Sequence, residues 1–190
     1  SSGVRGVVGE EITPPFVGKV AAAAGTVLDA ETLAIARDTR TTGRMLADAA
    51  ASALAAGGCS VHRLGIVPTP GAQAYAERHS VPVVMITASH NPPSYNGVKL
   101  IGADGVELTA RTLERIETRL TAAAAGTVGY GDVGTTPQVA RVRDAYTQER
   151  LEHLETARVR ASIAPSALPV ALHPAPRHGC STRPRSFVEP

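Results

Sequence analysis

The chain has 190 residues, of which 43% are hydrophobic and 19% charged, and its mean hydropathy is close to zero. These values are typical of a soluble globular protein of roughly one to one and a half domains, and no apolar run reaches the roughly 18 residues that a membrane span requires. The net charge of +2, the aromatic content of 3% and the absence of Trp argue against nucleic acid or an anionic membrane as the main partner.

The cysteines and the first residues bear on the cellular compartment. Cys59 and Cys180 follow neither a CxxC nor a zinc-ligand spacing, so we expect two buried thiols in a reducing environment. The opening SSGVRGVVGE contains neither Met nor a charged-then-apolar leader. We therefore expect a cytoplasmic protein.

Short apolar runs and helical stripes alternate along the first half of the chain. Residues 4–8 and 33–36 are predicted strands, and Thr13 with Pro14 is typical of a helix N-cap and first turn. A second helix, ended by Gly57, is predicted from the apolar positions Met45, Leu46, Ala49, Ala53 and Leu54.

The second half continues this alternation. Residues 61–67 and 81–86 are predicted strands, joined by a helix through 73–78, and the second strand is apolar enough to be buried on both faces. The run GVKLIG, the turn ADG and the run VEL predict a hairpin. Two more helices are predicted, one capped by Thr109 and one running from Val139 toward Leu154.

Strands that alternate with helices predict an α/β fold, with a mixed, mostly parallel sheet covered by helices on both faces. In such a fold, ligands gather at the carboxyl ends of the strands. Three loops there carry polar residues: GVRG (3–6), RDTRTTG (37–43) and TASHNPPSYNG (87–97). If these loops converge, cationic side chains surround one hydroxyl, which favours phosphoryl chemistry. The side chains expected on this rim are Arg5, Arg40, Ser89, His90 and Lys99.

The adjacent Ser89 and His90 also suggest a serine hydrolase, but the sequence argues against one. Adjacent side chains are expected to point apart, whereas a catalytic triad brings its histidine from elsewhere in the fold. No G-x-S-x-G elbow surrounds Ser89.

Pro92 and Pro93 stiffen the loop just after the serine, which suits a nucleophile that must be held in place.

The segment TASHNPPSYNGVK resembles the phosphoserine signature of the α-D-phosphohexomutase superfamily, including the spacing from Ser89 to Lys99. SSGVRG resembles that family's G-x-R-G, ARDTRTTG its D-x-R loop, and GIVPTPG the strand and turn after its first αβ unit. The resemblance covers about residues 1–136 and implies the first α/β/α domain of a phosphohexomutase.

The resemblance also implies roles for individual residues. Ser89 would carry a phosphoryl group, pass it to one hydroxyl of a hexose phosphate, and take another back after the bisphosphorylated sugar turns round. Lys99 and Arg5 would assist proton transfer or stabilise charge, and Arg40 would line the phosphoserine side of the cleft. The residues implied to support the serine loop are His90, Asn91, Arg40 and Asn96.

The resemblance further implies Mg²⁺, with the phosphate on Ser89 as one ligand, and a hexose 1,6-bisphosphate as intermediate and activator. The family has four domains, and its other Mg²⁺ ligands come from a D-x-D-x-D loop in the second, a motif that occurs nowhere in this sequence. Six of the fourteen prolines lie at 165–190. We therefore expect domain I at residues 1–136, a connecting helix at 137–160, and a truncated or aberrant, poorly ordered start of domain II at 161–190.

The sequence thus predicts intramolecular phosphotransfer on hexose phosphates by an incomplete enzyme that is inactive alone. Faces left by missing domains would allow self-association. One alternative is a non-catalytic remnant or subunit that binds a phosphosugar or a partner protein. Another is a phosphatase that uses Ser89 transiently.

Overall fold

A computed structural model of the protein describes residues 3–121 and 126–156. In this part of the chain, strands and helices follow one another as β1 (Gly3–Val7), α1 (Pro14–Leu28), β2 (Thr32–Arg37), α2 (Gly43–Ala56), β3 (Ser60–Ile66), α3 (Thr69–His79), β4 (Val83–Ile86), β5 (Tyr95–Ile101), α4 (Ala110–Thr121), the 3₁₀ turn η1 (Tyr130–Asp132) and α5 (Val142–Thr156). The predicted α/β class is confirmed.

The strands form one mixed sheet in the order β1-β5-β4-β2-β3. β2 is parallel to both β3 and β4, whereas β5 is antiparallel to its neighbours β4 and β1. Only β5 therefore runs against the other strands of this sheet. The carboxyl ends of β2, β3 and β4 lie at one edge, as expected for parallel neighbours, and the serine loop that joins β4 to β5 starts there.

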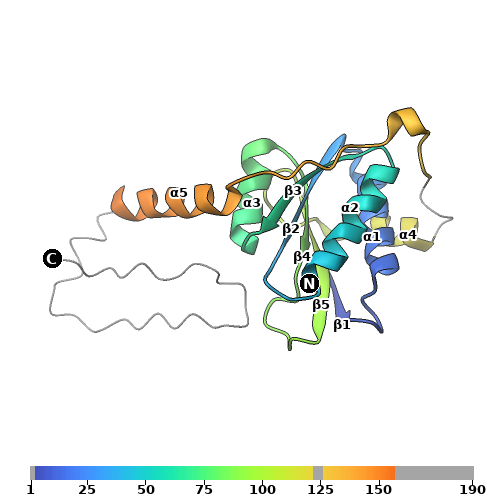
Figure 1. Cartoon of the computed structure of the whole chain (residues 1–190), viewed down its shortest axis with the longest axis horizontal. Coiled ribbons are helices and arrows are strands. Elements are labelled where there is room, and N and C mark those ends of the chain that lie inside the picture. Colours follow the sequence, from blue (N-terminus) through green and yellow to red (C-terminus); the bar gives the residue numbers. More distant parts are fainter. Residues whose placement is uncertain (1–2, 122–125, 157–190) are drawn as a thin grey trace.

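Helices cover both faces of the sheet (Figure 1). On one face, α1, α2 and α4 enclose a core that includes Leu33, Ile35 and Val98. On the other face, α3 covers a smaller core that includes Ala34, Met85 and Ile101. Successive strand residues alternate between these two cores, so the position of a residue in its strand decides which face it serves.

Local signals explain where two of the helices begin. The Thr13 hydroxyl accepts a hydrogen bond from the Phe16 N–H at 3.4 Å, and Pro residues occupy the first turn of α1. The Thr109 hydroxyl accepts from the Thr112 N–H at 3.3 Å at the start of α4. Both predicted caps are confirmed, and each satisfies an N–H group that the first helical turn leaves unpaired.

The predicted hairpin after β5 is shorter than expected. Gly105 takes a positive φ of 75°, and the Gly102 N–H donates to the Val106 carbonyl, but the returning chain pairs with β5 only through an isolated bridge between Ile101 and Glu107. The reason is that Leu108 packs against the core and Thr109 already caps α4. No second strand forms here among the described residues.

The helix predicted toward Leu154 is present as α5, and its first turns lie against α3 (Figure 1). The expectation for residues 161–190 lies outside the described residues. Among the described helices, none combines the length and the apolar character needed to span a membrane.

Two titratable groups are buried within the helix-covered core. Cys59 is a buried free thiol, as expected, and desolvation raises its pKa above the ordinary value. Desolvation likewise raises the pKa of Tyr75, whose hydroxyl lies 2.9 Å from Nδ1 of His62. Cys180 lies outside the described residues.

Candidate active site

The serine loop consists of two consecutive turns between β4 and β5. The Asn91 N–H donates to the Ala88 carbonyl at 3.1 Å, and the Tyr95 N–H donates to the Pro92 carbonyl at 3.0 Å. Because proline has a fixed φ and lacks an N–H, the loop has few other ways to fold between these two turns. The loop therefore presents Ser89 and His90 to solvent from a short, defined path.

Arg40, from the loop after β2, reaches into the serine loop and fixes its backbone. Its Nη1 donates to the carbonyls of Pro92 at 2.7 Å and Tyr95 at 3.0 Å. Its Nη2 donates to the carbonyls of Ser89 at 3.0 Å and Asn91 at 2.7 Å. With Nε donating to Asp38, all five N–H donors of the guanidinium are used inside the protein.

Arg40 is therefore a positioning residue in this structure, and its guanidinium keeps no N–H for a ligand. The side chain is buried, with 5% of its surface exposed. The resemblance implied that Arg40 would line the cleft, whereas the structure places it behind the loop. This difference arises because four loop carbonyls converge on one point, and a guanidinium offers donors in a matching planar fork.

Asp38 and Thr87 connect Arg40 to the serine. One carboxylate oxygen of Asp38 accepts from the Arg40 backbone N–H at 3.0 Å, and the other accepts from Arg40 Nε at 3.2 Å and from the Thr87 hydroxyl at 2.8 Å. The Thr87 hydroxyl in turn accepts from the Ser89 N–H at 3.0 Å. Sequence reasoning missed both residues, although an aspartate two residues before Arg40 is typical of an Asx turn.

Ser89 has a left-handed backbone conformation, with φ of 56°. This conformation is uncommon for a residue with a Cβ, and such residues cluster at functional sites. It also turns the side chain, so that Oγ lies 3.3 Å from Nδ1 of His90. The expectation that these adjacent side chains point apart was wrong, because it assumed an extended backbone. No carboxylate contacts His90 among the described residues, so this pair does not form a triad there.

Arg5 and Lys99 project from the sheet face that also carries Thr87. Arg5 pairs with Gly97 across β1 and β5, and Lys99 pairs with Met85 across β5 and β4. The Arg5 side chain passes over Gly97, where a Cβ would come within 2.9 Å of Arg5 Cγ. Directly opposed residues of antiparallel strands share a face. The two cations therefore lie on the same face of the sheet, Lys99 on the strand that follows the serine loop and Arg5 on the neighbouring strand.

Neither cation contacts Ser89 itself. Lys99 forms an ion pair with Glu107, and 21% of the lysine side chain is exposed. Arg5 is exposed. Among the described residues, no hydrogen bond joins either side chain to Ser89. The structure thus brings them to the same face without direct contact.

The two asparagines of the loop occupy different positions. Asn96 is fully buried on the α2 side of the sheet, where its Nδ2 donates to the Thr42 hydroxyl at 3.0 Å and its Oδ1 accepts from the Gly97 N–H at 2.9 Å. Asn91 takes part through its backbone, as acceptor from Arg40 and donor to Ala88. Asn96 therefore anchors β5 to the start of α2.

A pocket of about 290 Å³ opens beside the serine on the α3 side of the sheet. It is lined by Asp38, Val67, Pro68, Thr69, Met85, Thr87, Ser89 and His90. Its walls thus combine the exposed Ser89 with Thr69, the first residue of α3, and with Asp38 and Thr87, which connect Arg40 to the serine. A polar ligand fits such a pocket with one reacting group near Ser89.

The described residues do not by themselves provide a magnesium site. They contain no group of three or more His, Cys, Asp or Glu side chains placed to hold a metal ion. The one carboxylate that lines the Ser89 pocket, Asp38, is already engaged by Arg40 and Thr87. Mg²⁺ requires a nearly octahedral shell of oxygen ligands, which one serine oxygen does not supply.

This fold and serine loop define the first α/β/α domain of a phosphohexomutase. Residues 1–126 match the family model described as phosphoglucomutase/phosphomannomutase, alpha/beta/alpha domain I. The chain therefore belongs to the phosphoglucomutase/phosphomannomutase family.

Individual relatives agree with this assignment. The chain is 47% identical over 113 residues to a phosphoglucomutase/phosphomannomutase of Thermococcus kodakarensis, covering 56% of this chain and 25% of the relative. It is 43% identical over 127 residues to a phosphoglucosamine mutase of Synechococcus elongatus, covering 63% of this chain and 27% of the relative.

A solved structure gives the same result for the fold. The crystal structure of a phosphoglucomutase/phosphomannomutase family protein from Burkholderia thailandensis superposes with a TM-score of 0.68 at 27% identity, over 80% of this chain and 34% of that one. The chain thus spans between a quarter and about a third of the length of these relatives.

Proposed function

We propose that Ser89 carries a phosphoryl group and exchanges it with a hexose phosphate, as the phosphate-transferring residue of a phosphohexomutase. The observation that supports this proposal is an exposed serine beside a pocket, on a loop whose backbone Arg40 holds through hydrogen bonds to the Ser89 and Asn91 carbonyls. A phosphoryl acceptor has to be held still, because misplacement of about 1 Å costs on the order of 10²-fold in rate.

The proposed reaction has two half-reactions. In the first, the phosphorus–oxygen bond to Ser89 breaks and a sugar hydroxyl takes the phosphoryl group, which gives a hexose bisphosphate and returns a proton to the serine oxygen. In the second, Ser89 Oγ attacks the other phosphate of the reoriented sugar, loses its proton, and becomes phosphorylated again. No net phosphate is gained or lost, so the product is an isomer of the substrate.

The chain's own residues would contribute binding and positioning. Arg5 and Lys99 would face the negative charge of the phosphates, since both lie on the sheet face on which the Ser89 pocket opens, and Met85, the strand partner of Lys99, lines that pocket. Lys99 has three N–H donors, so it could donate to a phosphate oxygen and to Glu107 at the same time. His90 would hold the serine hydroxyl in one orientation through the 3.3 Å contact. An Mg²⁺ ion on the phosphoserine would need carboxylates beyond those the structure describes here.

Phosphopeptide mass spectrometry tests the proposal. The purified chain is incubated with glucose 1,6-bisphosphate, and we expect one phosphate on Ser89. Ser89→Ala should abolish the label, whereas Ser94→Ala, which removes an exposed hydroxyl from the same loop, should leave it. A label on another residue, or a label that persists in Ser89→Ala, would contradict the proposal, whereas an unlabelled Ser89 would favour the alternative of a non-catalytic remnant.

A further inference from the structure

A cationic pocket lies on the opposite face of the sheet from the pocket beside Ser89. It has a volume of about 320 Å³ and is lined by Ile35, Ala36, Arg37, Arg44, Ala47, Asp48, Arg63, Gly65 and Gln138. Arg37 and Arg63 alternate with residues of the α3-side core, so both project toward α2. This pocket is therefore separate from the pocket beside Ser89, which opens on the α3 side.

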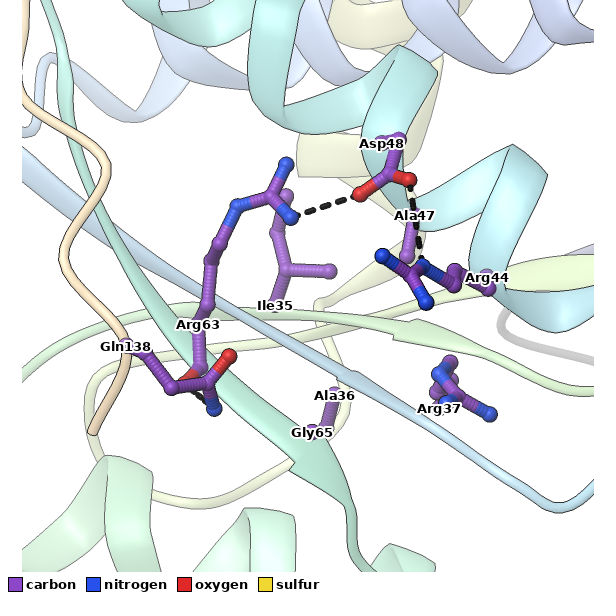
Figure 2. A pocket seen from close by; sticks show the side chains of 9 residues that line it. All are labelled: Ile35, Ala36, Arg37, Arg44, Ala47, Asp48, Arg63, Gly65 and Gln138. Carbon is purple, nitrogen blue, oxygen red and sulfur yellow. Dashed lines mark hydrogen bonds and ion pairs between the residues drawn. The ribbon is translucent and has the colours of Figure 1, made fainter. Parts of the chain in front are cut away.

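Three arginines and one carboxylate give the pocket a surplus of two positive charges. Figure 2 shows Arg63 and Arg44 approaching Asp48 from different sides, one from β3 and the other from α2. Arg63 Nη1 donates to Asp48 Oδ1 at 2.6 Å, and Arg44 Nε lies 3.8 Å from Oδ2. Arg37 donates through Nη1 to the Asp38 carbonyl at 3.2 Å. The Asp48 carboxylate thus lies within ion-pair distance of two guanidinium groups. Among the described residues, the guanidinium of Arg37 has only a neutral hydrogen-bond partner, the Asp38 carbonyl.

The donors in this pocket outnumber the acceptors. Each guanidinium has five N–H groups, and the contacts above use few of them. Nε of Arg63 is buried without any hydrogen-bond partner, and it is the one buried side-chain nitrogen or oxygen among the described residues in that state. A buried donor without an acceptor costs free energy. The cluster therefore favours a ligand that brings several acceptor oxygens.

The strands beneath the pocket are irregular. The register between β2 and β3 shifts at Ile35 and Ala36, opposite Gly65, which has a positive φ of 74°. Such bulges redirect side chains and recur beside binding sites. Ile35 and Ala47 line the pocket next to the guanidinium groups, whereas Ala36 belongs to the core on the α3 side, so the lining is mainly polar with a small apolar part.

We propose that this pocket binds the phosphate group of a small phosphorylated molecule. A phosphate monoester carries close to two negative charges at neutral pH, which matches the surplus charge, and its oxygens fit the planar fork of arginine. The small apolar part of the lining, at Ala47, would contact the organic part of the ligand, which inorganic phosphate lacks. This inference does not depend on chemistry at Ser89, because it uses other residues on another face.

The test is a titration of the full chain with inorganic phosphate, glycerol 3-phosphate and acetate at constant ionic strength, followed through the arginine Nε–Hε NMR signals. We expect the signals of Arg37, Arg44 and Arg63 to shift with phosphate and with glycerol 3-phosphate, the latter binding at least as tightly. Acetate should bind about tenfold more weakly, since it has one charge. Comparable shifts with acetate, or phosphate shifts confined to other arginines, would overturn the proposal.

Substitutions with opposite expected effects separate binding from loss of structure. Arg44→Gln should weaken phosphate binding by about five- to tenfold, and its side chain is 83% exposed, so folding should be unaffected. Asp48→Asn should strengthen binding by a similar factor, because it removes the one carboxylate. Arg115→Gln, which removes an exposed arginine from α4, serves as the charge-matched control. If Arg44→Gln binds like Arg115→Gln, or if Asp48→Asn binds no tighter, the proposal is wrong.

Discussion

Replacing Arg40 by alanine should destabilise the protein more than replacing any exposed arginine. The substitution removes five hydrogen bonds and leaves the Asp38 carboxylate, which is 14% exposed, without its cation. Removing one partner of a buried ion pair costs about 3–5 kcal/mol. Several of the loop carbonyls belong to exposed or half-buried residues and would be rehydrated, so each lost hydrogen bond costs less than the full desolvation of a buried carbonyl.

This loss is large compared with the stability of a typical domain, about 5–15 kcal/mol. For a chain of this size it corresponds to a decrease in Tm of about 10 °C. Urea unfolding followed by circular dichroism measures it. Arg40→Lys should fall between wild type and Arg40→Ala, because lysine keeps the charge but has three donors in place of five.

Arg78→Ala is the matched control, since Arg78 pairs with Glu149 at the surface with 52% of its side chain exposed. An exposed pair of this kind contributes about 0–1 kcal/mol. Amide hydrogen exchange adds a local measurement, and we expect Arg40→Ala to accelerate exchange at Asn91 and Tyr95, whose N–H groups close the two turns. If Arg40→Ala is no less stable than Arg78→Ala, the assignment of Arg40 as the clamp of the serine loop is refuted.

Three further substitutions or conditions test other parts of the structure. Gly97→Ala should lower the stability by roughly 1–3 kcal/mol in thermal unfolding, because its Cβ would meet the backbone oxygens of Val4 in β1 and of Thr87 just after β4. In Gly131→Ala the new Cβ meets nothing within 4 Å, so this control should be neutral. Thr13→Ala should lose about 1 kcal/mol in urea unfolding, since the Phe16 N–H loses its cap. Burial raises the pKa of Cys59 in the folded protein, so the thiol loses its proton at a lower pH in the unfolded chain. The free energy of unfolding should therefore be unaffected by this group below about pH 9 and decrease as the pH rises through the pKa of Cys59 in the folded protein. In Cys59→Ala this decrease should be less steep.

Much of the fold was predictable because its signals are local. The Thr13 cap, the glycine after α2 and the apolar run of β4 each depend on a few neighbouring residues, and all three are present as predicted. Strand order was not predictable in the same way. The placement of β5 between β4 and β1 depends on pairing between residues far apart in the sequence, and no local pattern specifies it.

The site shows the same division between local and long-range information. From the sequence, cationic side chains surround Ser89 if three loops converge, and the structure brings Arg40 of one of these loops into contact with the serine loop. What the sequence could not show is which way an arginine points, because the same side chain can bind a ligand phosphate or a set of backbone carbonyls. The roles of Asp38 and Thr87 were missed for a similar reason, since their partners lie on different loops.

The backbone conformation of Ser89 explains why a buried arginine holds the serine loop. A left-handed residue other than glycine costs about 1–2 kcal/mol, and Ser89 has this conformation. Left alone, the residue would relax toward an ordinary conformation and move the hydroxyl away from His90. The Arg40 guanidinium opposes this relaxation because it donates to the Ser89 carbonyl itself and to three other carbonyls of the loop. Its fifth N–H donates to Asp38, so Arg40 has no guanidinium N–H left for a ligand phosphate in this conformation.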